Sequence, residues 1–165
     1  FLFNPEKTNV LISAGIGLTP MMAMLNQLLT GNTDPNEKVT LWEKIKANFN
    51  KPEPKNPINF IHAVRNSRVH AMKETVQDLA KKHDNLNVFV AYEQTDSKDV
   101  LGCDYHAEGR LNLKQLDAKM LPKDADYYLC GPIPFMQVQH KALLELGIPA
   151  QNIHSEAFGT GGVAL

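Results

Sequence analysis

The chain has 165 residues, of which 43% are hydrophobic and 21% are charged, and its formal net charge is −1. These values suit one globular domain with a real core, and they give no sign of a nucleic-acid or anionic-membrane partner. No apolar run reaches the roughly 20 residues of a membrane span, and no secretory signal is visible. The two cysteines, Cys103 and Cys130, are too few for a disulfide framework. We therefore expect a cytoplasmic protein in a reducing compartment.

The most informative stretch is residues 10–25. The apolar run Val10–Ser13 predicts a buried strand, and Gly15-Ile16-Gly17 predicts a tight turn after it. Thr19 suits the N-cap and Pro20 the first position of a helix whose apolar stripe is Met21, Met22, Met24, Leu25, Leu28 and Leu29. Such a helix N-terminus favours a phosphate. The alternative is a plain strand-to-helix turn, because Pro20 stands where a GxGxxG fingerprint has its third glycine.

Residues 31–57 read as an insertion between the first helix and the second strand. The segment starts with a turn at 31–35 and ends with a proline-rich linker at 51–57. Between them, a short surface helix is predicted from Val39, Leu41, Trp42, Ile45 and Phe49. About 25 residues is long for a helix-to-strand connection. We expect a surface excursion here rather than a partner-binding site.

The remaining chain alternates strands with helices. Strands are predicted at 58–64, 86–92, 126–130 and 153–156, and helices at 69–83, 111–120 and 134–146, with a polar loop over 93–109. Ser67 is expected to cap the 69–83 helix, whose inward residues would be Val69, Met72, Val76 and Leu79. Gly147 suits the end of the last helix.

This alternation predicts an α/β fold, a doubly wound and mainly parallel five-stranded sheet with helices on both faces. Right-handed crossovers place ligands at the carboxyl ends of such strands. Those ends carry residues 15–17, 62–66, 92–94 and 130–132. The first end would hold a pyrophosphate, and the glycine-opened floor at 130–132 would leave room for a flat ring.

Two motifs in this order, Gly15-Ile16-Gly17-Leu18-Thr19-Pro20 and Cys130-Gly131-Pro132, resemble the NAD(P)H-binding domain of the ferredoxin–NADP reductase superfamily. Further stretches are similar to the reductase domain of flavohaemoglobins across nearly the whole chain except residues 31–57. They are residues 60–66, 69–72, 127–132, 135–137 and 152–159. The family often has Cys and Pro where this chain has Ala157 and Thr160, a departure that bears on the C-terminal flavin contact.

The resemblance implies a longer protein in which a globin domain and an FAD-binding barrel precede a reductase domain at 1–165. It implies oxidation of NADH or NADPH, electron flow through FAD to haem, and nitric oxide dioxygenase activity. The partners would be the FAD-binding and globin domains of the same chain. Residues 1–165 alone are expected to be inactive, because they lack the domain that would hold the flavin.

Candidate site residues follow from the strand ends and the resemblance together. The pyrophosphate loop would be Gly15, Ile16, Gly17, Leu18, Thr19 and Pro20, and the floor Gly131 and Pro132. Cys130 would lie beside the nicotinamide, where a small side chain lets the ring approach the flavin; the alternative is a buried structural thiol. By resemblance, Glu156 tunes the flavin's surroundings and Phe158, next to Gly159, contacts FAD; otherwise Phe158 is a packing residue.

The end of the strand at 86–92 bears on the choice of cofactor. Glu93 would repel a 2′-phosphate and could accept a hydrogen bond from a free ribose hydroxyl, so we expect NADH to be preferred over NADPH. Arg65, Arg68 or Lys98 could instead reach a 2′-phosphate, and Glu93 could simply face solvent.

No metal site is expected. The six histidines lack metal-ligand spacing and should mostly be solvated or structurally hydrogen-bonded. The acidic loop with Asp96, Asp99 and Asp104 lacks the glycine and glutamate of a calcium-binding EF-hand.

Two other functions stay open. The chain could belong to a flavin reductase that serves an iron–sulfur or oxygenase partner, which a cysteine-rich segment outside it would indicate. It could also be a dinucleotide-binding module without catalysis, which would show no flavin reduction by NADH.

Overall fold

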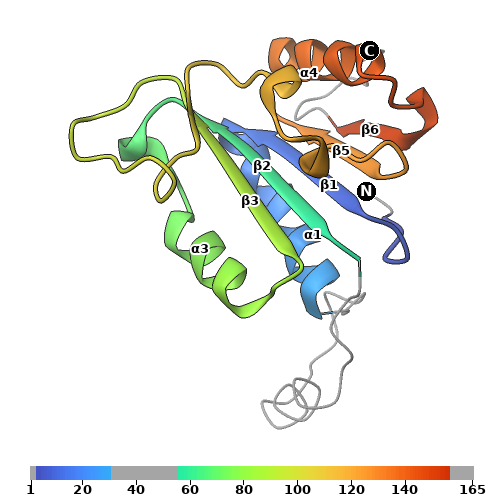
Figure 1. The fold of residues 1–165 in the computed structure, drawn as a ribbon, viewed down its shortest axis with the longest axis horizontal. Helices are drawn as coiled ribbons and strands as arrows, with labels where there is room; N and C mark the ends of the chain where they lie inside the picture. Colours follow the sequence, from blue (N-terminus) through green and yellow to red (C-terminus); the bar gives the residue numbers. More distant parts are fainter. Residues whose placement is uncertain (1–2, 31–55, 157–165) are drawn as a thin grey trace, which may run out of the picture.

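The computed structural model describes residues 3–30 and 56–156, and these residues form a six-stranded parallel sheet with helices on both faces (Figure 1). The strands lie in the order β4-β3-β2-β1-β5-β6. They are β1 (Asn9–Ala14), β2 (Ile58–Val64), β3 (Leu86–Tyr92), β4 (Ala107–Glu108), β5 (Asp126–Cys130) and β6 (Ile153–Glu156). The described α-helices are α1 (Leu18–Thr30), α3 (Lys73–Lys82) and α4 (Ile133–Glu145). The predicted doubly wound α/β fold is confirmed.

The two faces of the sheet follow from the alternation of side chains along β1. Leu11 packs on one face with the apolar stripe of α1 and with Val76 of α3. Val10 and Ile12 pack on the other face with Met136 of α4. Successive residues of a strand point to opposite faces, so one apolar strand serves both cores, as expected of a parallel sheet buried on both sides.

Two asparagines, the buried Asn59 and the exposed Asn87, tie down the amino edge of the sheet. Asn59 donates its amide to the carbonyls of Lys119 and Met120, both at 3.0 Å. Asn87 donates in turn to the side-chain oxygen of Asn59 at 2.9 Å. These bonds hold the segment around Met120 against the amino ends of β2 and β3. The cleft described below lies at the opposite edge, at the carboxyl ends of the strands.

The predicted strands after residue 30 are confirmed at their predicted residues, and the predicted 134–146 helix is confirmed within one residue at each end. The prediction of five strands was wrong, because β4 has two residues and is too short to give a periodic signal. The predicted helix over 111–120 was also wrong. Residues 113–115 and 118–120 form two 3₁₀ turns instead, capped by the side chains of Asn112 and Asp117. Local side-chain bonds of this kind compete with helix formation.

Two helix starts also differ from the predictions. Thr19 is not an N-cap, since the chain passes from β1 through a 3₁₀ turn at Gly15–Gly17 directly into α1, which begins at Leu18. Pro20 lies in the first turn, where its missing N–H costs nothing. The helix predicted over 69–83 begins only at Lys73. Met72 has left-handed backbone angles, which are not those of an α-helix, so the helix cannot extend back through it. Val69 and Met72 are therefore exposed rather than inward.

Some expectations lie outside the described residues. Nearly all of the 31–57 insertion falls there, as do Phe158 and Gly159. Over residues 3–30 and 56–156, no helix is long and apolar enough to cross a bilayer.

Candidate functional site

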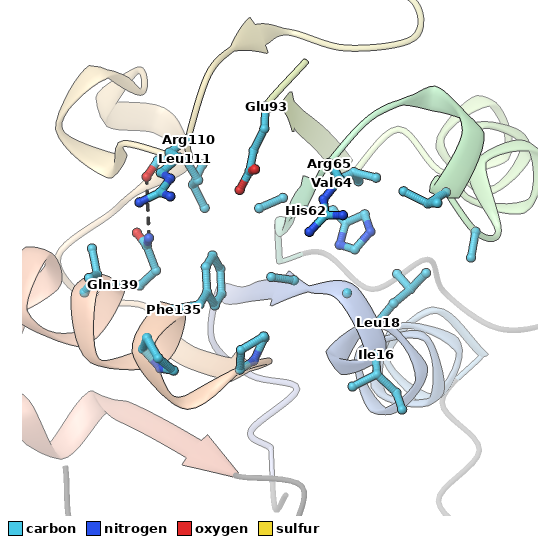
Figure 2. Close-up of a pocket in the computed structure, with 18 of the residues that line it drawn as sticks. Ile16, Leu18, His62, Val64, Arg65, Glu93, Arg110, Leu111, Phe135 and Gln139 are labelled. Carbon is cyan, nitrogen blue, oxygen red and sulfur yellow. Dashed lines mark hydrogen bonds between the residues drawn. The ribbon is translucent and has the colours of Figure 1, made fainter. Parts of the chain in front are cut away.

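A cleft of about 790 Å³ opens at the carboxyl ends of β1, β2 and β3, between the start of α1 and the start of α4 (Figure 2). Most of the lining residues come from three segments, the turn into α1, the end of β2 with the turn after it, and the start of α4, and Glu93, Arg110 and Leu111 complete the lining. The chain winds to one side of β1 through β2 and β3 and to the other through β5 and β6. Such a switch point is where open parallel sheets bind ligands.

The glycine loop packs its backbone directly on the end of β5. A Cβ on Gly17 would lie 2.1 Å from the carbonyl oxygen of Cys130 and 2.7 Å from the nitrogen of Gly131. No side chain fits at such distances, so Gly17 is required for the two strand ends to meet. Gly15 is different: its φ of +53° favours glycine, yet a Cβ there would meet nothing within 4 Å.

The end of β5 is closely packed. A Cβ on Gly131 would lie 3.1 Å from the carbonyl oxygen of Ala14 and from the ring of Phe135. Cys130 is fully buried beneath it. Burial, with a smaller effect of Glu156, raises the pKa of the Cys130 thiol to about 11. Cys130 is therefore protonated at neutral pH and is unsuited to act as a nucleophile, since the thiolate is the reactive form.

Charged side chains follow the ends of β2, β3 and β4. Figure 2 shows Glu93 extending toward the cleft between Arg110 and Arg65. Arg68 and Lys98, the other cations considered from the sequence, do not line the cleft. Arg68 lies 3.3 Å from Asp96 in an exposed ion pair instead. The cleft therefore carries one carboxylate and two cations at this end.

A buried histidine forms the back wall beside these charges. His62 is 2% exposed, and its Nδ1 lies 2.8 Å from the Ser13 hydroxyl. Burial, with a smaller contribution from the nearby His70, lowers the pKa of His62 to about 4. The ring of His70 is 5.6 Å from that of His62, centroid to centroid. At neutral pH both rings are uncharged, so this wall adds no positive charge.

The chain matches the family model described as "Oxidoreductase NAD-binding domain" over residues 11–141. It belongs to that family. The domain is also 44% identical over 155 residues to the flavohemoprotein of Bordetella pertussis, covering 94% of this chain and 33% of that protein. It is 43% identical over 152 residues to the flavohemoprotein of Chromobacterium violaceum, covering 92% and 32%. The domain thus spans about a third of these relatives.

Solved structures show the same fold. One is the flavohem-like FAD/NAD binding domain of nitric oxide dioxygenase from Vibrio cholerae, with a TM-score of 0.70 and 31% identity, covering 96% of this chain and 54% of that one. Another is the flavohemoglobin of Malassezia yamatoensis with bound FAD and heme, with a TM-score of 0.67 and 28% identity, covering 94% and 33%. The ferredoxin reductase-like architecture of the NAD-binding domain is thereby confirmed.

The structure brings together only part of the predicted site. Six of the predicted residues line the cleft: Gly15, Ile16, Leu18, Thr19, Glu93 and Pro132. Five others do not line it: Gly17, Pro20, Cys130, Gly131 and Glu156. Gly17, Cys130 and Gly131 instead form the tightly packed support beneath it. Glu156 pairs with Cys130 across the β5–β6 ladder.

Sequence reasoning missed much of the cleft wall of the NAD-binding domain. One side of α4 contributes Phe135, Val138 and Gln139 to the cleft wall. Val138 and Gln139 lie three and four residues after Phe135, a helical spacing close behind Gly131-Pro132 that could have revealed them. Arg110 and Leu111 follow β4, and no sequence signal marks so short a strand. The expectation that the histidines are structurally hydrogen-bonded is confirmed for His62 and His70. In the described ranges, no group of His, Cys, Asp and Glu could hold a metal ion.

Proposed function

We propose that this NAD-binding domain binds NADH in the cleft and presents it for hydride transfer to FAD held by another domain of the same protein. The observation that carries the proposal is the cleft itself, which lies at the switch point and joins a glycine loop and helix start to an acidic strand end. By similarity to the flavohemoproteins, the whole protein would carry FAD and a haem-binding globin domain and would act as a nitric oxide dioxygenase.

The residues of the cleft suit the parts of a dinucleotide. Gly15, Ile16 and Thr19 lie where the start of α1 meets the cleft, and the N–H groups and dipole of a helix start favour a pyrophosphate. Pro132 lies at the β5 end, beside the proposed place of the nicotinamide. The nicotinamide supplies the hydride, and the domain contributes binding, orientation and exclusion of water.

Four predicted residues would act near the flavin. Cys130 would support the place of the nicotinamide from beneath Gly131 as a small, uncharged side chain, since its thiol is protonated and held fixed by burial. Glu156 is a carboxylate at the end of β6, next to Cys130, and would adjust the field around the flavin. We keep the contact of Phe158 and Gly159 with FAD as a proposal from the resemblance.

NADH would be preferred to NADPH. Glu93 extends toward the cleft, where a carboxylate repels a 2′-phosphate and can accept a hydrogen bond from the ribose hydroxyl. Arg65 and Arg110 oppose this preference, since each could pair with a 2′-phosphate. The two free cysteines support a cytoplasmic location for this chemistry.

The test uses the full native protein that contains residues 1–165. It is mixed rapidly with NADH, and reduction of the flavin is followed by the change in flavin absorbance. We expect the flavin to be reduced, and Cys130→Ser to slow the reduction at saturating NADH. The matched control is Cys103→Ser, which changes the exposed cysteine away from the cleft and should leave the rate unchanged. A protein that binds NADH without reducing flavin would be a non-catalytic dinucleotide-binding module.

A further inference from the structure

A pocket of about 260 Å³, here called the side pocket, lies on the face of the sheet that α1 and α3 cover. Its floor consists of two cross-strand pairs of β2 and β3, Phe60 with Val88 and His62 with Val90. One side of α3 forms a wall, and the loop before β4 forms another. Protein interiors leave few voids larger than a water molecule, so this much space between a helix and its sheet is unusual.

The end of the side pocket at Phe60 and Val88 is apolar. Val76 and Ala80 of α3 line this pocket and belong to the same apolar cluster as Phe60 and Val88. Valine and alanine are small, so they leave the space open where leucine or phenylalanine would reach into it. An apolar cavity of about 150 Å³ already holds benzene, so the side pocket has room for an aromatic ring with a substituent.

The other end of the side pocket is polar, because three histidines gather there. The ring of His70 lies 5.6 Å from that of His62, centroid to centroid. The N–H of Val90 donates to Nδ1 of His106 at 3.0 Å. Burial is the largest cause that lowers the pKa of all three imidazoles, so they are neutral at neutral pH. A neutral His106 therefore carries its proton on Nε2, where it can donate to a ligand.

The side pocket has no unbalanced charge. Among the described residues that line it, only Lys73 and Asp104 are ionised at neutral pH, and they form an ion pair with each other. Burying a phosphate or carboxylate without a counter-charge is costly. The pocket therefore suits an uncharged ligand, in contrast to the cleft with its free cations.

We propose that the side pocket is a second ligand site of this domain and that it takes a neutral phenol. The aromatic ring would lie between α3 and the floor of β2 and β3, against Phe60 and the histidine rings, which can pair with it edge to face or stacked. The hydroxyl would lie at the histidine end. A hydroxyl both donates and accepts hydrogen bonds, so it can satisfy His106 as well as an imidazole in the other tautomer.

The side pocket and the cleft share a wall. Leu18, His62 and Ala71 line both of them. A phenol would therefore contact, from one side, residues that line the NADH cleft on the other. Holding a wall in place before a ligand arrives lowers the ordering cost of binding, so we expect the phenol to tighten NADH binding. This coupling rests on the proposed function, whereas the site for the phenol does not.

The first experiment locates the ligand. Crystals of the full native protein are soaked with 4-bromophenol, and the anomalous signal of bromine shows where it binds. We expect a bromine peak between α3 and the floor of β2 and β3, with the hydroxyl at the histidine end. Bromine peaks only elsewhere in the protein would overturn the proposal.

The second experiment fills the side pocket and titrates the protein with 4-methylphenol in a calorimeter. Ala80→Leu should raise the dissociation constant about tenfold or more, because the added side chain takes the place of the ring. The matched control is Thr75→Leu, which adds a leucine to an exposed position of α3 that does not line the pocket and should leave binding unchanged. Equal affinity of Ala80→Leu and the native protein would place the phenol elsewhere.

Two further titrations test the chemistry of the site. The charged 4-methylbenzoate should bind about tenfold more weakly than 4-methylphenol, or worse, because no free cation receives it. Val76→Ala enlarges the pocket, so it should favour 2-naphthol over 4-methylphenol more strongly than the native protein does; this variant decides the matter if Ala80→Leu does not fold. Tighter binding of the benzoate, or an unchanged preference in Val76→Ala, would contradict the proposed site.

The coupling is tested by measuring the dissociation constant for NADH with and without saturating 4-methylphenol. We expect the constant to fall about fivefold in the native protein and to stay unchanged in Ala80→Leu. An unchanged constant in the native protein with 4-methylphenol bound would overturn the coupling. A protein that binds 4-methylphenol in the side pocket but no NADH would support the second site and contradict the proposed function.

Discussion

The two sides of the cleft differ in whether backbone or side chains form them. At the ends of β1 and β5, backbone packs on backbone, with Gly17 against the carbonyl of Cys130 and Gly131 against that of Ala14. At the ends of β2 and β3, the wall is made of side chains, among them Glu93 and Met72. Substitutions at the ends of β1 and β5 therefore damage the fold. The side chains at the ends of β2 and β3 can be exchanged without disturbing the backbone, so this side of the cleft can select among nucleotides.

The backbone side is tested most severely by Gly17→Val. The added Cβ would lie 2.1 Å from the carbonyl oxygen of Cys130, so the end of β5 must move. We expect a loss of about 3 kcal/mol or more in the free energy of unfolding, together with loss of nucleotide binding. Denaturant titration measures the first. The control is Gly15→Asn, which meets open space and tolerates positive φ, and it should cost much less. Equal stability of the Gly17 variant and the native protein would contradict the backbone account.

The histidine wall should make stability depend on pH. Burial lowers the pKa of His62 from 6.5 to about 4, so the unfolded chain binds the proton more tightly than the folded one. The free energy of unfolding therefore has its full value above about pH 6.5 and falls as the pH drops toward 4. His62 contributes about 3 kcal/mol to this loss. Denaturant titrations at several pH values measure it.

The pH dependence has its own controls. His62→Phe should make the curve less steep over this window, and the remaining slope would come from groups such as His70, whose pKa is also lowered to about 4. His140→Gln, on α4 and outside the buried pair, should leave the slope as in the native protein. A slope unchanged by removal of His62 would show that other groups cause the acid sensitivity.

The side-chain wall is tested by Glu93→Arg. Exchanging a repulsive carboxylate for a cation should narrow the gap between NADH and NADPH in kcat/KM by roughly 1 kcal/mol, with little change in stability. The control is Glu108→Arg, an exposed carboxylate on β4 that does not line the cleft. If the native protein prefers NADPH, or if both variants shift the ratio equally, Glu93 does not select the cofactor.

The smallest effect is expected for Arg68→Ala. Arg68 and Asp96 form an exposed ion pair near the cleft but outside its lining, with 81% and 41% of their side chains exposed. Such pairs contribute little, so we expect no measurable change in the free energy of unfolding and an unchanged KM for NADPH. A marked rise in KM for NADPH would bring Arg68 back as a 2′-phosphate ligand.

The sequence predicted the backbone side of the site better than the side-chain side. Strand, glycine turn and helix are local patterns, so β1, α1 and the Gly15–Gly17 turn could be recognised from neighbouring residues alone. That Gly17 packs on Cys130 depends on the pairing of β1 with β5, which brings together residues more than a hundred positions apart. The sequence therefore indicated Gly17 as a site residue, but it could not show that Gly17 is required for the packing of β1 on β5.

The side-chain wall was harder to predict because it depends on irregular backbone. Val69 and Met72 have helical spacing, which predicted them as buried, but the left-handed angles of Met72 turn both out to the cleft. No residue type signals such a turn, since methionine rarely adopts it. Arg110 reaches the cleft through the two-residue β4, which periodicity cannot detect.

A crystal structure of the native protein with NADH would show whether NADH crosses the cleft between these two sides. We predict the pyrophosphate beside Gly15 and Thr19, the adenine at the ends of β2 and β3, and the nicotinamide at the end of β5. A further cavity, of about 550 Å³, lies at the amino edge of the sheet and is lined in part by Asn87 and Lys119. NADH bound in that cavity, or bound in the cleft with its bases reversed, would contradict the account.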